Sequence, residues 1–108
     1  MPRWLPQVLR RIRELAASGR VSFTDKASWE AQQLGLSRND VVQILGSLTG
    51  GDGPTRMQSD ARHERLYCFR PTLAELRLYL KVAIRTSCVV ISCHEDQAEA
   101  PEEADRDE

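Results

Sequence analysis

Residues 78–96, LYLKVAIRTSCVVISCHED, decide the fold of this chain because they read as two β-strands joined by a short polar turn. Apolar and polar residues alternate over residues 78–85, which is the period of a half-buried strand. Residues 88–94 are again rich in β-branched side chains and end in a histidine. A turn of two or four residues sets one register between the strands, and a turn of three breaks it. In that register the opposite pairs are Arg85 with Cys88, Lys81 with Ser92, and Tyr79 with His94.

Residues that lie directly opposite each other in such a pair share a face of the sheet. The sequence therefore predicts one polar, cationic face and one apolar face that packs in the core. The core side would carry Leu78, Leu80, Val82, Ile84, Val89, Ile91 and Cys93. The polar side would carry Tyr79, Lys81, Arg85, Ser92 and His94. A tyrosine, a histidine and two cations gathered on one face indicate a functional site.

The charge of the chain is distributed unevenly. The 108 residues suffice for one domain with a single core, and the net charge is −1. Residues 1–94 nevertheless hold 14 basic and 8 acidic side chains, whereas residues 95–108 hold 8 acidic side chains and one arginine. A basic body favours binding to a polyanion. The arginine content has a second explanation, because high genomic GC content also enriches arginine.

Several classes of protein are disfavoured by the sequence. It contains no apolar run of the roughly 20 residues that span a bilayer, and no signal peptide is recognisable, so we expect a cytoplasmic protein. The three cysteines, Cys68, Cys88 and Cys93, fit no metal-ligand spacing, and we expect reduced thiols and neither a metal site nor a cofactor. Phosphate-loop, dinucleotide-binding and serine-hydrolase motifs are missing from the sequence.

The first half of the chain has the pattern of helices. Apolar residues at helical spacing predict a helix over residues 5–16, and capping residues predict a second over residues 26–34 and a third that starts after Ser37. Between the first two, residues 21–23 form a short extended piece. Residues 56–59 and 64–70 are further strand candidates. Helices followed by strands predict an α+β domain over residues 1–96, with N-terminal helices packed on one face of a C-terminal antiparallel sheet. Residues 97–108 are expected to be an acidic, disordered tail.

The polar face offers groups that could cleave RNA. Cleavage without a metal ion needs a base for the ribose 2′-hydroxyl, cations for the phosphate and an acid for the leaving 5′-oxygen. His94 could transfer the proton, Tyr79 could donate a hydrogen bond or stack on a base, and the cations Lys81, Arg85 and Arg56 could offset phosphate charge. A surface histidine, a half-buried tyrosine and solvated edge cations remain the alternative interpretation.

Three stretches together carry a family resemblance. They are QLGLSRNDVVQILGSLTGGD at residues 33–52, FRP at residues 69–71, and residues 78–96. With their spacing, they resemble the MqsR family of toxins from bacterial type II toxin–antitoxin systems. The resemblance implies a fold like that of RelE-type ribonucleases, with an open sheet face that binds mRNA. It also implies sequence-selective, metal-independent mRNA cleavage that arrests growth, and a cognate antitoxin with zinc-binding and helix-turn-helix domains.

Individual roles follow from the resemblance position by position. The catalytic tyrosine of the family falls on Tyr79, and His94 stands where the family has a basic residue, commonly lysine. Arg70 matches the family arginine in the FRP segment. Thr55 stands in place of a loop lysine, with Arg56 as the nearest cation, and Leu66 stands in place of a glutamine, with Arg65 beside it.

The implied site is therefore His94 and Tyr79 for catalysis, with Lys81, Arg56, Arg70, Arg85 and Arg65 for binding RNA phosphates. Attack by the 2′-hydroxyl would yield a 2′,3′-cyclic phosphate. Because residues 55 and 66 depart from the family pattern, an alternative function remains: a catalytically weakened RNA-binding or regulatory module of the same fold. The sequence leaves open the cleavage-site preference and whether cleavage requires the ribosome.

Overall fold

The structure is a computed structural model that describes residues 2–59 and 61–96. The expected disorder of the acidic tail concerns residues 97–108, which lie outside the described residues. The elements in chain order are α1 (Leu5–Ala17), β1 (Val21–Phe23), α2 (Asp25–Gln33), α3 (Arg38–Gly46), β2 (Thr55–Ser59), β3 (Glu64–Phe69), β4 (Thr72–Leu73), β5 (Leu76–Ile84) and β6 (Cys88–Glu95). The predicted α+β class, with N-terminal helices and a C-terminal sheet, is confirmed. None of the described helices is long and apolar enough to cross a membrane.

Local sequence signals account for the helix boundaries. The hydroxyl of Thr24 accepts a hydrogen bond from the backbone N–H of Ala27 and caps α2. Ser37 and Asp40 form a reciprocal capping box at the start of α3. After α1 the chain turns at Gly19, whose φ of 75° is a conformation that glycine adopts without strain.

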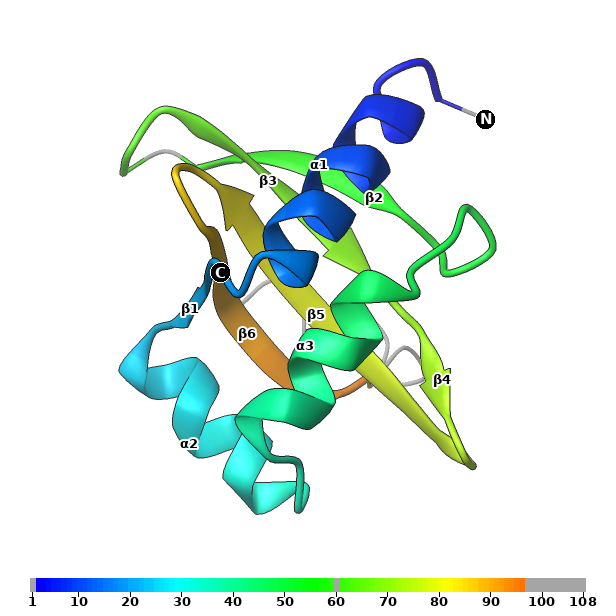
Figure 1. The fold of residues 1–108 in the computed structure, drawn as a ribbon, viewed down its shortest axis with the longest axis vertical. Coiled ribbons are helices and arrows are strands. Elements are labelled where there is room, and N and C mark those ends of the chain that lie inside the picture. The colour runs from blue at the N-terminus through cyan, green and yellow to red at the C-terminus, as the bar shows by residue number, and fades with distance from the viewer. Residues whose placement is uncertain (1, 60, 97–108) are drawn as a thin grey trace.

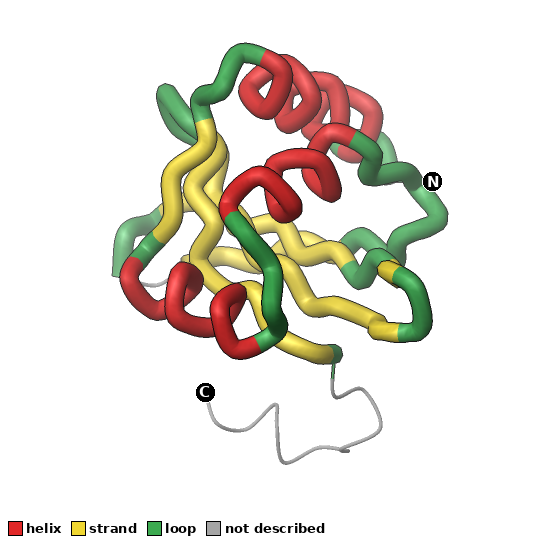
Figure 2. The backbone as a smooth tube through the Cα atoms, turned by 60° about the horizontal axis from the view of Figure 1, so that its bottom comes forward, coloured by secondary structure: helices red, strands yellow, loops and turns green. Residues whose placement is uncertain are grey.

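The sheet has the strand order β1-β6-β5-β3-β2, and β4 pairs with β5 outside this path. All pairs are antiparallel except β1 with β6. Helices α1 and α3 lie side by side over one face of the curved sheet, and α2 lies beside β6 (Figures 1 and 2). In the middle of β5, the even-numbered residues Leu78, Leu80 and Val82 are fully buried in the core beneath these helices. The odd-numbered residues of β5 therefore lie on the face that α1 and α3 do not cover.

The connection between β5 and β6 differs from the one the sequence predicts. Residues 85–87 form a three-residue loop, so that Cys88 pairs with Ile84 instead of Arg85. A bulge at Ile91 then inserts one extra residue into β6, and beyond it Lys81 pairs with Ser92 and Tyr79 with His94 as predicted. The loop shifts the register by one residue and the bulge shifts it back.

The predicted faces of β6 are consequently correct on only one side of this bulge. Val89 was expected in the core, but it lies opposite Ala83 on the uncovered face. Cys88 and Val90 are fully buried in the core instead. Beyond the bulge the expected alternation is restored, so that Cys93 packs into the core and His94 lies on the uncovered face.

Helix α2 covers the part of β6 that β1 is too short to reach. The carboxylate of Glu30 accepts a hydrogen bond of 2.8 Å from the backbone N–H of Cys93, where a further strand would otherwise pair. Lys26 donates to the hydroxyl of Ser92 at 3.0 Å and forms an ion pair of 3.2 Å with Glu30. The Glu30 contact satisfies one backbone N–H on the free edge of the strand that carries His94, and Lys26 holds Glu30 in place.

Candidate functional site

Three side chains, from β5, from β6 and from the residue that follows β3, form a stack on the uncovered face. The ring centroids of Tyr79 in β5 and His94 in β6 lie 5.0 Å apart, and their planes are 20° from parallel. On the β3 side, the guanidinium carbon of Arg70 lies 5.2 Å from the centroid of the Tyr79 ring, within the range of a cation–π contact. Arg70 directly follows the last residue of β3, and continuing the pairing of Phe69 with Leu80 brings it opposite Tyr79. We call Arg70, Tyr79 and His94 the stack.

A hydrogen bond assigns the proton on the His94 ring. Its Nδ1 atom lies 2.9 Å from the carbonyl oxygen of Glu95. Because a carbonyl oxygen only accepts hydrogen bonds, Nδ1 must carry the hydrogen. In the neutral ring, Nε2 then holds the lone pair that can accept a proton.

Tyr79 is held as a neutral phenol. Burial raises its pKa well above the ordinary value of 10.0, and the contact with Cys68 raises the pKa further. The phenol oxygen lies 3.1 Å from the sulfur of Cys68, which is fully buried beneath it. At neutral pH the hydroxyl therefore remains protonated and can donate a hydrogen bond to an anion, which suits it to bind a phosphate oxygen.

The cations predicted for this face occupy different places on it. Lys81 follows Tyr79 by two residues along β5 and lies on the same face. Arg85 lies about 20 Å further along the strand direction from Tyr79, at the far end of β5, given six residues at about 3.3 Å each. There it forms two hydrogen bonds with the carboxylate of Glu64, at 2.7 and 3.2 Å. Arg85 is thus already paired and lies apart from the stack.

Arg56 and Arg65 are not brought to the stack. Arg56 pairs with Tyr67 of β3, whose side chain faces the helices, so Arg56 also lies on the helix-covered face. Its guanidinium carbon lies 5.4 Å from the ring of Trp4, which in turn lies 5.4 Å from the ring of Tyr67. Arg65 is two residues from Tyr67 on β3 and therefore lies on that same face.

The two positions at which the chain departs from the resembled family do lie on the uncovered face. Thr55 pairs with Cys68, and Leu66 pairs with Ala83. Both partners share a face with Tyr79 and Lys81. This face therefore carries a hydroxyl and an apolar side chain at these positions, and the neighbouring Arg56 does not replace a cation there.

Sequence reasoning missed two residues that contact the stack. Cys68 was treated only as a small strand residue, although the register of β3 with β5 brings it beside Tyr79. Asp96 was given no role beyond its place at the end of the hairpin stretch, but its carboxylate lies 3.5 Å from the Nε atom of Arg70. Strand alternation could have indicated Cys68 once β3 and β5 were paired, whereas no local pattern signals the ion pair of Asp96.

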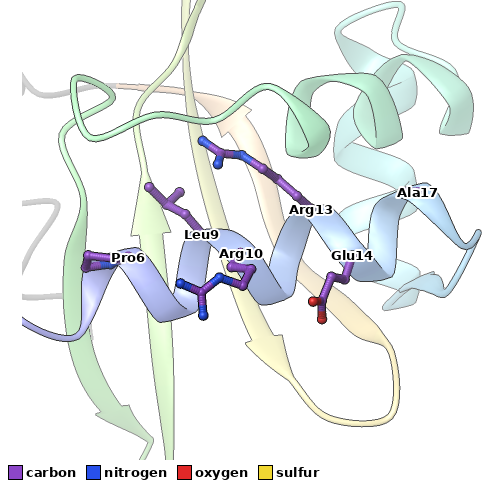
Figure 3. Close-up of a pocket in the computed structure, with 6 residues that line it drawn as sticks. All are labelled: Pro6, Leu9, Arg10, Arg13, Glu14 and Ala17. Carbon is purple, nitrogen blue, oxygen red and sulfur yellow. The ribbon is translucent and has the colours of Figure 1, made fainter.

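A separate hollow lies away from the stack. It has a volume of about 590 Å³ and runs along α1, lined by Pro6, Leu9, Arg10, Arg13, Glu14 and Ala17 (Figure 3). Arg13 is partly engaged there, since it donates a 2.7 Å hydrogen bond to the carbonyl of Leu48 after α3. None of its lining residues belongs to the stack. Its charged side chains are two arginines and one glutamate, and the described residues that line it include no histidine, so it offers no pair of groups for proton transfer. Within residues 2–59 and 61–96, no three His, Cys, Asp or Glu side chains gather closely enough to hold a metal ion.

Comparison with known proteins identifies the family. A search of curated proteins found no match to this chain. The family model described as "Motility quorum-sensing regulator, toxin of MqsA" matches residues 6–95. The matched region contains every strand of the described sheet and all three residues of the stack. The resemblance found in the sequence is thereby confirmed, and the chain belongs to the MqsR family of toxins.

Proposed function

We propose that this protein is a sequence-selective, metal-independent mRNA endoribonuclease, the toxin of a type II toxin–antitoxin system. The observation that carries the proposal is the stack of Arg70, Tyr79 and His94 on the sheet face that α1 and α3 leave uncovered. It combines a proton acceptor, a neutral hydrogen-bond donor and a cation at one point. Membership in the toxin family supports the biological role.

In the proposed reaction, Nε2 of His94 takes the proton from a ribose 2′-hydroxyl. The 2′-oxygen then forms a bond to phosphorus while the bond from phosphorus to the 5′-oxygen breaks. Arg70 and the phenol of Tyr79 stabilise the negative charge that develops on the phosphate oxygens. The ammonium group of Lys81 supplies the proton for the leaving 5′-oxygen. The products are a 2′,3′-cyclic phosphate and a free 5′-hydroxyl.

The direct test is cleavage of a defined mRNA by the purified protein in the presence of EDTA. We expect fragments that end in a 2′,3′-cyclic phosphate, identified by mass spectrometry. A variant that combines His94→Ala with Tyr79→Phe should bind RNA and leave it intact. Full cleavage by this double variant would refute the proposed site, and loss of wild-type cleavage in EDTA would refute metal independence.

A second candidate function is a catalytically weakened RNA-binding or regulatory module of the same fold. It is favoured by Thr55 and Leu66, which give the uncovered face one hydroxyl and one apolar side chain where the resembled family carries polar or charged groups. Growth after induction distinguishes the two candidates. Arrest that His94→Ala relieves supports the enzyme, whereas RNA binding without arrest supports the module.

The proposed partners follow from the family. We propose a cognate antitoxin, with zinc-binding and helix-turn-helix domains, that neutralises the toxin in the cytoplasm. If the reading frame adjacent to the toxin gene encodes it, its co-expression should restore growth, and the two proteins should elute together on gel filtration. Comparing cleavage of free mRNA with that of translated mRNA tests whether the ribosome takes part.

A further inference from the structure

Asp96 directly follows β6 and connects the strands that carry the stack. One carboxylate oxygen, Oδ1, lies 3.5 Å from Nε of Arg70, and the other, Oδ2, lies 3.2 Å from Nε of Arg77. Its backbone N–H donates a 2.8 Å hydrogen bond to the carbonyl of Arg77. Asp96 is thus joined to the end of β3 through Arg70 and to the start of β5 through Arg77.

The position of this carboxylate is unusual for an acidic residue near the end of a strand. Its side chain is only 5% exposed, and two guanidinium groups flank it. Oδ2 has no hydrogen-bond partner in the described structure, although Arg77 is close enough for an ion pair. A buried carboxylate stays charged only when cations compensate for its lost hydration. The contact therefore restrains Arg70 and Arg77 as much as it restrains Asp96.

The contact with Arg70 has a geometric consequence for the stack. Asp96 engages the Nε atom of Arg70, while the guanidinium carbon stays 5.2 Å from the centre of the Tyr79 ring. The two terminal nitrogens of Arg70 are then the ones available to a phosphate. On the other side of Tyr79, His94 lies two residues before Asp96 on the same strand, so anchoring Asp96 also fixes the strand end that carries the imidazole.

We propose that Asp96 is a positioning residue of the site, which holds Arg70 against the Tyr79 ring and keeps His94 in register beside it. This inference rests on the proposed function for its effect on cleavage. Its structural part, the order of the stack, can be measured on the protein without RNA.

The first measurement is NMR of the His94 ring protons in the RNA-free protein. In the wild type, stacking on Tyr79 should shift these resonances upfield, and in Asp96→Asn they should move toward the values of an unstacked histidine. Glu75→Gln is the matched control, because it removes the same charge from an exposed residue in the turn between β4 and β5. Unchanged His94 shifts in a folded Asp96→Asn protein would overturn the proposal, and so would an equal change in Glu75→Gln.

The second measurement is the kinetics of RNA cleavage by the same variants. A displaced stack should lower kcat by about 100-fold, because small misplacements of reacting groups are costly, while KM changes less. Asp96→Glu, which keeps the charge, should recover part of kcat. If Asp96→Asn fails to fold, Arg77→Gln decides, because it removes one of the two anchors and leaves the stack residues intact. Normal NMR shifts and normal kcat values in the folded Asp96→Asn and Arg77→Gln proteins would overturn the proposal. If the wild type does not cleave RNA but the variants show the expected NMR changes, only the ribonuclease function is refuted.

Discussion

Tyr79 and His94 face each other from adjacent antiparallel strands, with ring centroids 5.0 Å apart and planes 20° from parallel. The contact joins a phenol that stays protonated at neutral pH to an imidazole whose Nδ1–H is bound to the carbonyl of Glu95. The hydrogen-bond donor and the proton acceptor are therefore side by side on one surface, and each can be removed separately.

Single replacements of these two residues should lower cleavage for different reasons. His94→Ala removes the proton acceptor and should reduce kcat by roughly 10²- to 10⁴-fold. Tyr79→Phe keeps the stacked ring but removes one donor to the phosphate, and should reduce kcat by about 10²-fold with little change in KM. Single-turnover cleavage assays measure both values, and circular dichroism checks the fold. Equal activity of the wild type and either variant would contradict the assigned roles.

Arg56 and Arg70 provide a matched test of which sheet face binds RNA. Arg70→Gln removes the cation beside Tyr79 and should weaken RNA binding and lower its salt slope by about one. Arg56→Gln removes a cation from the opposite face and should leave kcat unchanged. Its main effect should be a loss of stability of about 0.5–1 kcal/mol from the contact with Trp4. Cleavage that slows more in Arg56→Gln than in Arg70→Gln would show that the helix-covered face contributes to the site.

The ion pair of Glu64 with Arg85 should make a small, pH-dependent contribution to stability. Hydrogen bonds from Arg85 lower the pKa of Glu64 below its ordinary value of 4.5. Since the pKa is lower in the folded state, the stabilisation is present above pH 4.5 and is lost as the pH falls through the folded value. Both side chains are partly exposed, so Glu64→Gln should cost no more than about 1 kcal/mol near neutral pH.

Urea unfolding of the wild type and Glu64→Gln at neutral pH and at about pH 3 measures this contribution. The difference between the two proteins should shrink at the lower pH. A difference that grows on acidification would contradict the assigned direction of the pKa shift.

The cysteines should be unreactive in the folded protein. Burial raises the pKa of Cys88 to about 12 and that of Cys93 to about 11. All three thiols, including Cys68, are fully buried. Because thiolates are the reactive form, an aromatic disulfide reagent at mildly alkaline pH should label none of them until urea is added. Rapid labelling of one thiol in the native state would show that its strand opens locally.

Much of the fold could be predicted from local patterns in the sequence. Capping residues and apolar spacing gave the helix positions to within about two residues, because these signals act between neighbours along the chain. Alternation in β5 identified its buried residues and placed Tyr79 and Lys81 on the other face. The pairing of Tyr79 with His94 was also predicted correctly, although the loop assumed for it was wrong.

By itself, the sequence determined the helices, the alternation of the strands and the family. Only the tertiary structure decided that a three-residue loop is offset by a bulge at Ile91, that Arg56 faces the helices, and that Asp96 holds Arg70 against Tyr79. The first set depends on contacts between residues close in the chain or on strict strand periodicity. The second depends on how separate strands are registered against one another, and a shift of one residue there reverses the face on which every following side chain lies.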